Sequence, residues 1–139
     1  MLFRMLYTSA AVGPVTTAVT GTILRVAQAH NAAHGITGVL CQGRGRYLQV
    51  LEGERSALDA LYARIAADQR HKDLVLVCAQ TITSRRYGRW AMAHVDLADA
   101  DERMAFSATS SAPAGSSEQL MAQIDALITA GKVMTEPVV

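Results

Sequence analysis

The amino-acid sequence predicts an α+β fold, in which a ferredoxin-like five-stranded mixed sheet carries two helices on one face and C-terminal helices on the other. The first observation is the order of hydrophobic patterns, which runs β-α-β-β-α-β-β over residues 1–97. Its first six elements follow the split-βαβ plan, in which the first and third strands are neighbours at the sheet centre. The second observation is an amphipathic stretch within residues 98–139, which needs an apolar surface to cover. We therefore expect a main domain over residues 1–97 and a helical extension over residues 98–139, both within one compact unit.

The first strand is predicted over residues 2–9, LFRMLYTS, because its side chains alternate between two faces. One face carries Phe3, Met5, Tyr7 and Ser9, and the other carries Leu2, Arg4, Leu6 and Thr8. A helix is predicted over residues 17–34, since Gly35 is a typical residue just past a helix end. The apolar stripe of this helix comprises Val19, Ile23, Val26 and Ala27.

The next two strands, residues 36–42 and 46–53, are predicted to pair as a hairpin around the turn GRG. A second helix follows over residues 55–67. Its inner face comprises Leu58, Leu61, Tyr62 and Ile65. Residues 73–82 are continuously apolar, which is typical of a strand that is covered on both faces.

A fifth strand is predicted over residues 88–97, where alternation places Trp90 and Met92 on one face. Beyond it, residues 99–107 indicate a short helix. Residues 108–117 are rich in small side chains and indicate a flexible connector.

The last predicted helix covers residues 118–131, with Ser116 or Ser117 as its cap and Gly131 at its end. Its apolar stripe comprises Leu120, Ile124, Leu127 and Ile128. We expect this stripe to cover the sheet face that carries Leu2 and Leu6.

The composition argues against several functional classes. The net charge is +1, and no run of Lys and Arg lies on one predicted face, so nucleic-acid binding is not expected. Cys41 and Cys78 lie in apolar strands and are too few for a disulfide framework, which indicates a reducing, cytoplasmic location. The N-terminal residues MLFRMLYTSA are too interrupted for a signal peptide. No apolar run approaches the roughly 18 residues of a membrane span, so no membrane association is expected.

Several polar side chains are predicted to point into the core. Alternation turns Tyr7 toward the helices, and Gln49 lies on the third strand, beside the first. Because a buried amide without a partner costs about 1–3 kcal/mol, Gln49 needs an explanation. Asn31 and His30 lie at the margin of the apolar stripe of the first helix. Since a partly satisfied network of buried polar groups is costly, the convergence of these residues on one pocket is less easily dismissed than any one of them alone.

Each of these residues also has a purely structural interpretation. A buried Tyr commonly packs its ring and donates its hydroxyl to a backbone group. Asn31 could bond the carbonyls at the helix end, and His30 could be half-exposed. Gln49 could bridge two strands, and the Trp and Met of the fifth strand are typical core residues.

Motifs of standard catalytic sites are not found in the sequence. It has no Walker A loop, no GxGxxG after a strand and no CxxC. His30 and His34 are spaced to share a metal ion, but no Cys or carboxylate is placed to complete the ligand shell, so no metal site is predicted. Ser9 has no evident His base. Arg64 and Asp68 are spaced for a surface salt bridge on the second helix.

Five motifs, in this order, resemble those of the blue-light-using-flavin (BLUF) domain family. They are LYTS, AHNAAHGITGVL, YLQVLEG, IAADQRH and RRYGRWAM. The resemblance covers about residues 1–95, and the tail is similar to the C-terminal helices of short members without an enzymatic output domain. Three positions depart from residues that members usually carry: Gln42, Leu48 and Tyr87, the last of which adds a second phenol.

The resemblance implies a non-covalently bound FAD, with FMN as the alternative, whose ring lies between the two helices. It implies that Tyr7 is the electron donor and that Gln49 lies between Tyr7 and the N5/O4 edge of the flavin. Asn31 would hold the O4/N3 side of the ring. The other implied positions are Ile23 and His30 at the ring, Arg64 and Asp68 at the pocket or the ribityl chain, and Ser9, Trp90 and Met92 near Gln49.

The resemblance therefore implies a photoreceptor rather than an enzyme. Light would rearrange the hydrogen bonds of Gln49, and the C-terminal helices would pass the signal to a separate, unidentified protein partner. A homo-oligomer is also expected. Two alternatives stay open at this point: a small flavoenzyme, and a light-insensitive ferredoxin-like module that regulates or oligomerises.

Overall fold

The computed structural model describes residues 1–13, 17–43, 45–96 and 117–130. Its five-stranded mixed sheet, with helices on both faces, confirms the predicted ferredoxin-like α+β class. Of the described helices, none is both long enough and apolar enough to cross a membrane. The elements are β1 (Leu2–Ala11), α1 (Thr17–His34), β2 (Thr37–Gly43), β3 (Arg46–Glu54), α2 (Arg55–Ala67), β4 (His71–Thr81), β5 (Ala93–Asp96) and α3 (Ser117–Thr129).

The strands lie in the order β4-β1-β3-β2-β5, so β1 and β3 are neighbours at the sheet centre, as predicted. Neighbouring strands are antiparallel except for β2 and β5, which are parallel. The register places Tyr7 of β1 directly beside Gln49 of β3. Residues paired in this way have Cβ atoms about 4.5–5.5 Å apart, so the two side chains can interact across the strands.

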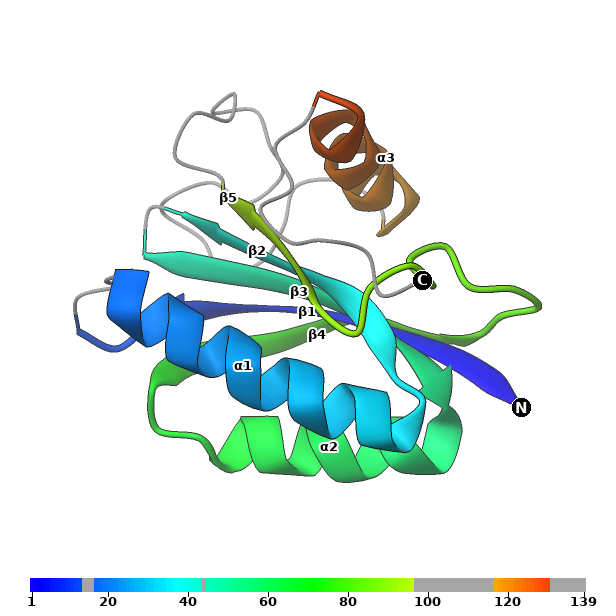
Figure 1. The fold of residues 1–139 in the computed structure, drawn as a ribbon, viewed down its shortest axis with the longest axis horizontal. Helices are drawn as coiled ribbons and strands as arrows, with labels where there is room; N and C mark the ends of the chain where they lie inside the picture. The colour runs from blue at the N-terminus through cyan, green and yellow to red at the C-terminus, as the bar shows by residue number, and fades with distance from the viewer. Residues whose placement is uncertain (14–16, 44, 97–116, 131–139) are drawn as a thin grey trace.

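Helices cover the two faces of the sheet unequally, as Figure 1 shows: α1 and α2 lie on one face and α3 on the other. We call these the α1/α2 face and the α3 face. The core of the α1/α2 face includes Phe3, Leu51 and Leu58. The core of the α3 face joins Leu6 and Val50 of the sheet to Leu120, Met121 and Ile124 of α3. The prediction that the last helix covers the face carrying Leu6 is therefore confirmed.

The segment before β5 differs from its prediction. β5 begins only at Ala93, and the Gly38 N–H of β2 donates to the Trp90 carbonyl at 3.1 Å before the parallel pairing starts. Trp90 lies in the core of the α3 face, whereas Met92 lies in the core of the α1/α2 face. The prediction that these two residues share one face is therefore wrong, because an irregular segment need not alternate like a strand.

Two further predictions are corrected. β4 is an edge strand with many half-buried and exposed side chains, because only β1 pairs with it and α3 contacts the opposite edge at β5. Leu74 packs against the core of the α1/α2 face and Val77 and Cys78 pack against that of the α3 face, but all three are only half-buried, so the cover predicted for both faces is partial. Val26 was expected in the buried stripe of α1 but is 56% exposed. The short helix predicted at residues 99–107, most of the connector and Gly131 lie outside the described residues.

Candidate functional site

A cavity of about 190 Å³ lies between α1, α2 and the sheet. Eight of the ten predicted site residues line it: Tyr7, Ser9, Ile23, His30, Asn31, Gln49, Arg64 and Asp68. The side chains come from β1, α1, β3 and the C-terminal end of α2, which are far apart in the sequence. The fold thus brings most of the predicted polar residues to one site.

Tyr7, Gln49 and Met92 form a chain of side-chain contacts at this site. The Tyr7 hydroxyl donates to Gln49 Oε1, and Gln49 Nε2 donates to Met92 Sδ at 3.4 Å. All three residues are buried. Each end of the amide therefore has one side-chain partner, and Tyr7 does not use the backbone acceptor that the structural interpretation favoured.

The Tyr7 phenol is held among other rings. The ring of Tyr62 lies edge-on at 6.1 Å between centroids, and that of His71 lies edge-on at 6.4 Å. Burial raises the pKa of Tyr7 well above its ordinary value, and the nearby Tyr62 and Asp68 raise it further. Tyr7 is therefore a neutral phenol whose proton is engaged with Gln49.

Two more side-chain amides donate hydrogen bonds to the backbone at and next to Met92. Asn31 Nδ2 donates to the Ala91 carbonyl at 2.7 Å, and Gln28 Nε2 donates to the Met92 carbonyl at 3.0 Å. The Asn31 side chain thus bonds a segment 60 residues away and not the carbonyls of its own helix end. With Gln49, three amides hold residues 91 and 92 at the margin of the cavity.

Trp90 was predicted near Gln49 but lies away from the cavity. Its side chain is buried in the α3 face, on the far side of the sheet from Tyr7. Met92 does not line the cavity either, but it contacts Gln49 directly. Of the two residues, Met92 is the neighbour of the Tyr7–Gln49 pair.

Asp68 has a different partner from the one predicted. It accepts from the Arg70 guanidinium at 2.5–3.0 Å and from the Arg70 backbone N–H at 2.9 Å. These bonds lower the pKa of the Asp68 carboxyl. α2 ends at Ala67, so Asp68 leaves the helix and cannot pair with Arg64 as an i,i+4 neighbour. Among the described residues Arg64 has no hydrogen bond or ion pair, although it lines the cavity.

Four polar residues at the site were not predicted: Gln28, Tyr47, Arg70 and His71. Gln28 lies on the polar side of the predicted helix stripe, so hydrophobic periodicity gave no signal for it. Arg70 and His71 belong to the motif IAADQRH, which contained the only sequence signal that could have pointed to them. His71 bonds both Ser9 and the Ile65 carbonyl.

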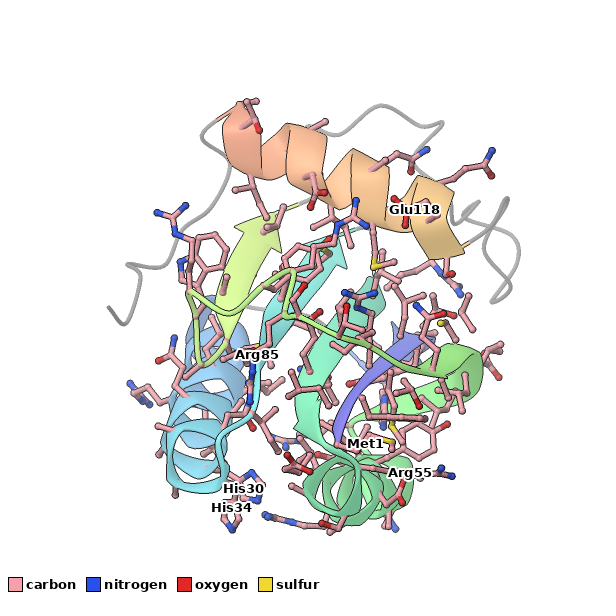
Figure 2. The ribbon with its side chains drawn as sticks, turned by 90° about the vertical axis from the view of Figure 1, so that its right-hand side faces the viewer. Met1, His30, His34, Arg55, Arg85 and Glu118 are labelled. Atoms are coloured by element: carbon pink, nitrogen blue, oxygen red, sulfur yellow. The ribbon has the colours of Figure 1, made fainter. Side chains whose placement is uncertain are left out.

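The His30 and His34 rings stack with centroids 4.2 Å apart, and Figure 2 shows them side by side on α1. His34 Nδ1 lies 2.8 Å from the His30 carbonyl, which gives it a backbone partner. Within the described residues, no three His, Cys, Asp or Glu side chains are grouped so that they could hold a metal ion.

The donor set fits a planar, imide-bearing heteroaromatic ligand such as a flavin. Apolar side chains, Ile23 among them, provide walls for a flat ring, while Asn31 and Gln49 offer amide donors and acceptors. The cationic Arg64 and Arg70 suit the phosphate of a nucleotide tail. This combination of apolar walls and a few convergent polar groups is typical of cofactor pockets.

Comparison with known proteins points the same way. The family model described as "Sensors of blue-light using FAD" (BLUF) matches residues 2–93. The chain is 37% identical over 103 residues to photoactivated adenylate cyclase subunit alpha from Euglena gracilis, which covers 74% of this chain. The match spans only 10% of that relative, so the chain corresponds to about a tenth of its length.

Two solved structures illustrate the likeness in fold. "BlrB - a BLUF protein, dark state structure" superposes with a TM-score of 0.73 at 27% identity, covering 94% of this chain and 96% of that chain. BlrP1 from Klebsiella pneumoniae, solved with FMN and cyclic diGMP, gives a TM-score of 0.66 at 31% identity, covering 70% of this chain and 26% of that one. The second relative is thus much longer than the part that this chain matches.

Proposed function

The chain belongs to the BLUF family of blue-light flavin sensors, and we propose that it is a photoreceptor in which Tyr7 and Gln49 carry the light reaction. The family membership agrees with the prediction of a sensor rather than an enzyme. The observation that carries the proposal is the buried chain from the Tyr7 hydroxyl through the Gln49 amide to Met92 Sδ. It joins an oxidisable phenol to a side chain that can reverse its hydrogen bonds.

A bound flavin would supply the absorption of blue light and an excited state that can take up an electron and a proton. Tyr7 would give up the electron, and its phenolic proton would follow to the flavin by way of the Gln49 amide that it already contacts. Burial raises the pKa of Tyr7 well above its ordinary value, so the ground-state phenol keeps its proton, and loss of an electron is what makes that proton acidic. Tyr7 regains both when the dark state returns, so the chain undergoes no net chemical change.

Gln49 converts this transient event into a new arrangement of hydrogen bonds. Its Oε1 is fixed by the Tyr7 hydroxyl, and that bond is lost while the proton is away. The amide is then free to turn or tautomerise, and this exchanges its donor and acceptor ends. If the amide turns, the bond from Nε2 to Met92 Sδ is broken, because Oε1 has no hydrogen to donate to the sulfur.

The segment of residues 85–92 is the proposed route out of the pocket. Its pocket end is held by the amides of Gln28, Asn31 and Gln49. At its other end the Arg86 and Tyr87 backbone N–H groups donate to the buried Glu52 carboxylate at 3.0 and 2.7 Å. Loss of one pocket contact therefore loosens a segment that is anchored elsewhere.

The far end of this segment is tied to α3. Arg86 pairs with Asp125 at 2.7 Å and with Glu118 at 3.0 Å, and Figure 2 shows Glu118 at one end of α3. The Tyr87 hydroxyl donates to the Met121 carbonyl at 3.3 Å. We propose that movement of the 85–92 segment shifts α3 and so changes the surface offered to a separate protein partner or to a second copy of the chain.

The proposed cofactor is FAD, with FMN as the alternative, because Arg64 and Arg70 can meet the phosphates of either. The free cysteines Cys41 and Cys78 support the proposed cytoplasmic location. Mass spectrometry of the flavin released from gently purified protein distinguishes FAD from FMN. A protein purified without any flavin would contradict the proposal.

The deciding experiment is the absorption spectrum of the full chain before and after blue light. We expect flavin bands that shift reversibly to the red. Gln49→Leu should keep the flavin and lose the shift, whereas Gln80→Leu, at an exposed position of β4, should keep both. A normal shift in Gln49→Leu would remove Gln49 from the mechanism. Rapid reduction of the flavin by NAD(P)H in the dark would instead favour the flavoenzyme alternative.

A further inference from the structure

His71 bonds two groups of the pocket wall, and this geometry determines which ring nitrogen carries the hydrogen in the neutral imidazole. Its Nε2 is 2.6 Å from the Ile65 carbonyl, and its Nδ1 is 2.8 Å from Ser9 Oγ. A carbonyl oxygen accepts but never donates, so Nε2 must carry a hydrogen. In the neutral imidazole Nδ1 is then an acceptor, and the Ser9 hydroxyl donates to it.

This arrangement gives the side-chain hydroxyl of the fully buried Ser9 a hydrogen-bond partner. Ser9 is 0% exposed, and His71 is the partner that the described residues provide for its side chain. Because its hydrogen is committed to His71, Ser9 turns only acceptor lone pairs toward the cavity that both residues line. His71 also lies edge-on to the Tyr7 ring, as Tyr62 does.

The backbone of β4 is irregular close to His71. Thr8 pairs with Val75 but Ala10 pairs with Lys72, so two steps along β1 correspond to three along β4. The extra residue is a β-bulge, and within it Asp73 has a φ of 56°, in the left-handed region that non-glycine residues rarely adopt. Asp is one of the few residues that tolerate this conformation.

The bulge changes which way residue 71 points. Leu74 packs into the core of the α1/α2 face, so strict alternation would send residue 72 to that face and residue 71 to the other. With one additional residue, Leu74 and His71 both face α1 and α2, although they are three positions apart. The bulge in β4 therefore turns the His71 imidazole toward Ser9 and Tyr7. Bulges beside functional sites commonly re-aim a side chain in this way.

We propose that His71, as the neutral Nε2–H tautomer, is a positioning residue of the photochemical site: it fixes the Ser9 hydroxyl and one side of the Tyr7 ring, and the Asp73 bulge is the backbone device that places it. The proposal rests on the proposed light reaction for its functional consequence. The tautomer and the Ser9 bond do not depend on light.

The direct test is nitrogen NMR of the histidine side chains of ¹⁵N-labelled full-length protein in the dark, with and without flavin. One imidazole should show a protonated Nε2 and an unprotonated, hydrogen-bonded Nδ1. This signal should disappear in His71→Gln, and its Nδ1 shift should move in Ser9→Ala. An Nδ1–H tautomer at neutral pH would overturn the proposal. So would an Nδ1 chemical shift that is the same in the wild type and in Ser9→Ala.

The functional test compares two substitutions at the same position. His71→Leu removes both hydrogen bonds, so the amount of red-shifted state formed per absorbed photon should fall by roughly tenfold. His71→Gln can donate to the Ile65 carbonyl and accept from Ser9, so it should stay within about twofold of the wild type. Equal photochemistry in the wild type and His71→Leu would show that His71 positions nothing.

Two further variants test the role of the bulge at Asp73. Asp73→Gly keeps the left-handed conformation without a side chain and should retain the NMR signal of His71. Deletion of Asp73 restores alternation and should abolish that signal; retention of the signal would refute the role of the bulge. Should the deletion variant fail to fold, the Leu and Gln variants still decide the proposal. If the wild type shows no red shift at all, the proposed light reaction fails, while the NMR result still decides the tautomer.

Discussion

Tyr7 and Tyr87 are two buried phenols on opposite faces of the same sheet, and the groups that accept their hydroxyl hydrogens differ. Each is about 5% exposed or less, and burial raises the pKa of both well above the ordinary value. Tyr7 donates to the amide of Gln49, a side chain that can turn. Tyr87 donates to the Met121 carbonyl, a backbone group fixed within α3.

The difference teaches that burial of a phenol does not by itself make a switch. On the α1/α2 face, the partner of the phenol can exchange its donor and acceptor ends beside a cavity. On the α3 face, the carbonyl partner has one role only, and the nearby Asp125 carboxylate is itself held in an ion pair with Arg86 at 2.7 Å. We therefore assign the light reaction to the first phenol and the anchoring of α3 to the second.

The comparison is tested most strongly by removing each hydroxyl in turn. Tyr7→Phe should abolish the light-induced red shift, because the residual ring is a far poorer electron and proton donor. Tyr87→Phe should keep the shift and reduce the free energy of unfolding by about 1 kcal/mol, the usual worth of one hydrogen bond. Absorption spectra and urea unfolding measure the two effects. A lost shift in Tyr87→Phe would remove the distinction.

The next largest effect concerns Glu52, which holds the 85–92 segment from the α3 face. Its carboxylate is 0% exposed and pairs with Arg4 at 2.8 Å. Glu52→Gln leaves the Arg4 guanidinium buried without its counter-charge, so the free energy of unfolding should fall by about 3 kcal/mol. Glu54→Gln is the matched control, since its exposed pair with the Met1 amine should contribute below about 1 kcal/mol. Equal effects of the two variants would contradict the role of Glu52.

Alkaline pH should act on both phenols together. The pKa of each is raised in the folded state, so below about pH 10 both states of the chain are protonated and stability is unaffected. Above that pH the unfolded chain loses these protons first, so the free energy of unfolding should fall by up to about 1.4 kcal/mol per pH unit for each tyrosine. Urea unfolding across this range should show a shallower slope in Tyr7→Phe and in Tyr87→Phe. An unchanged slope in either variant would mean that its phenol is not buried.

The smallest expected effect is at the partly exposed ion pairs of Arg86. Arg86→Gln should cost below about 1 kcal/mol of stability. It should nevertheless loosen α3, and Cys41 reports this because it is fully buried in the α3-face core and burial raises the pKa of its thiol to about 12. In a Cys78→Ser background, thiol labelling of Cys41 should be faster in Arg86→Gln than in Arg55→Gln, which breaks an exposed pair on α2.

Alternation and element order were sufficient to predict the sheet and its central pair. Tyr7 and Gln49 lie in regular strands, where parity decides the face and the split-βαβ plan decides the neighbour. Met92 and Trp90 precede β5 in an irregular segment, so parity could not separate them. Their placement depends on hydrogen bonds from residues about 40 to 60 positions away.

Neither the partner of Asp68 nor the orientation of His71 could be predicted from the sequence, and the reasons are related. The i,i+4 spacing of Arg64 and Asp68 holds only within a helix, and Asp68 is already extended, with a ψ of 122°. His71 precedes the strand predicted over residues 73–82, and its face depends on a bulge that periodicity cannot detect, because one extra residue reverses the face of a side chain. Both departures occur at the ends of regular elements, where side chains and not repeat patterns determine the path of the chain.

The 85–92 segment also contains the single tryptophan of the sequence, Trp90, packed in the α3 face with its neighbour Arg89 over the ring at 5.1 Å. The protein therefore has an intrinsic fluorophore in the segment that contacts both the pocket and α3. Its emission can be excited in the ultraviolet, outside the blue band that would drive the light reaction. Time-resolved fluorescence of unlabelled protein can thus follow the segment itself, and the delay between flavin and tryptophan signals would time the passage of a signal through the sheet.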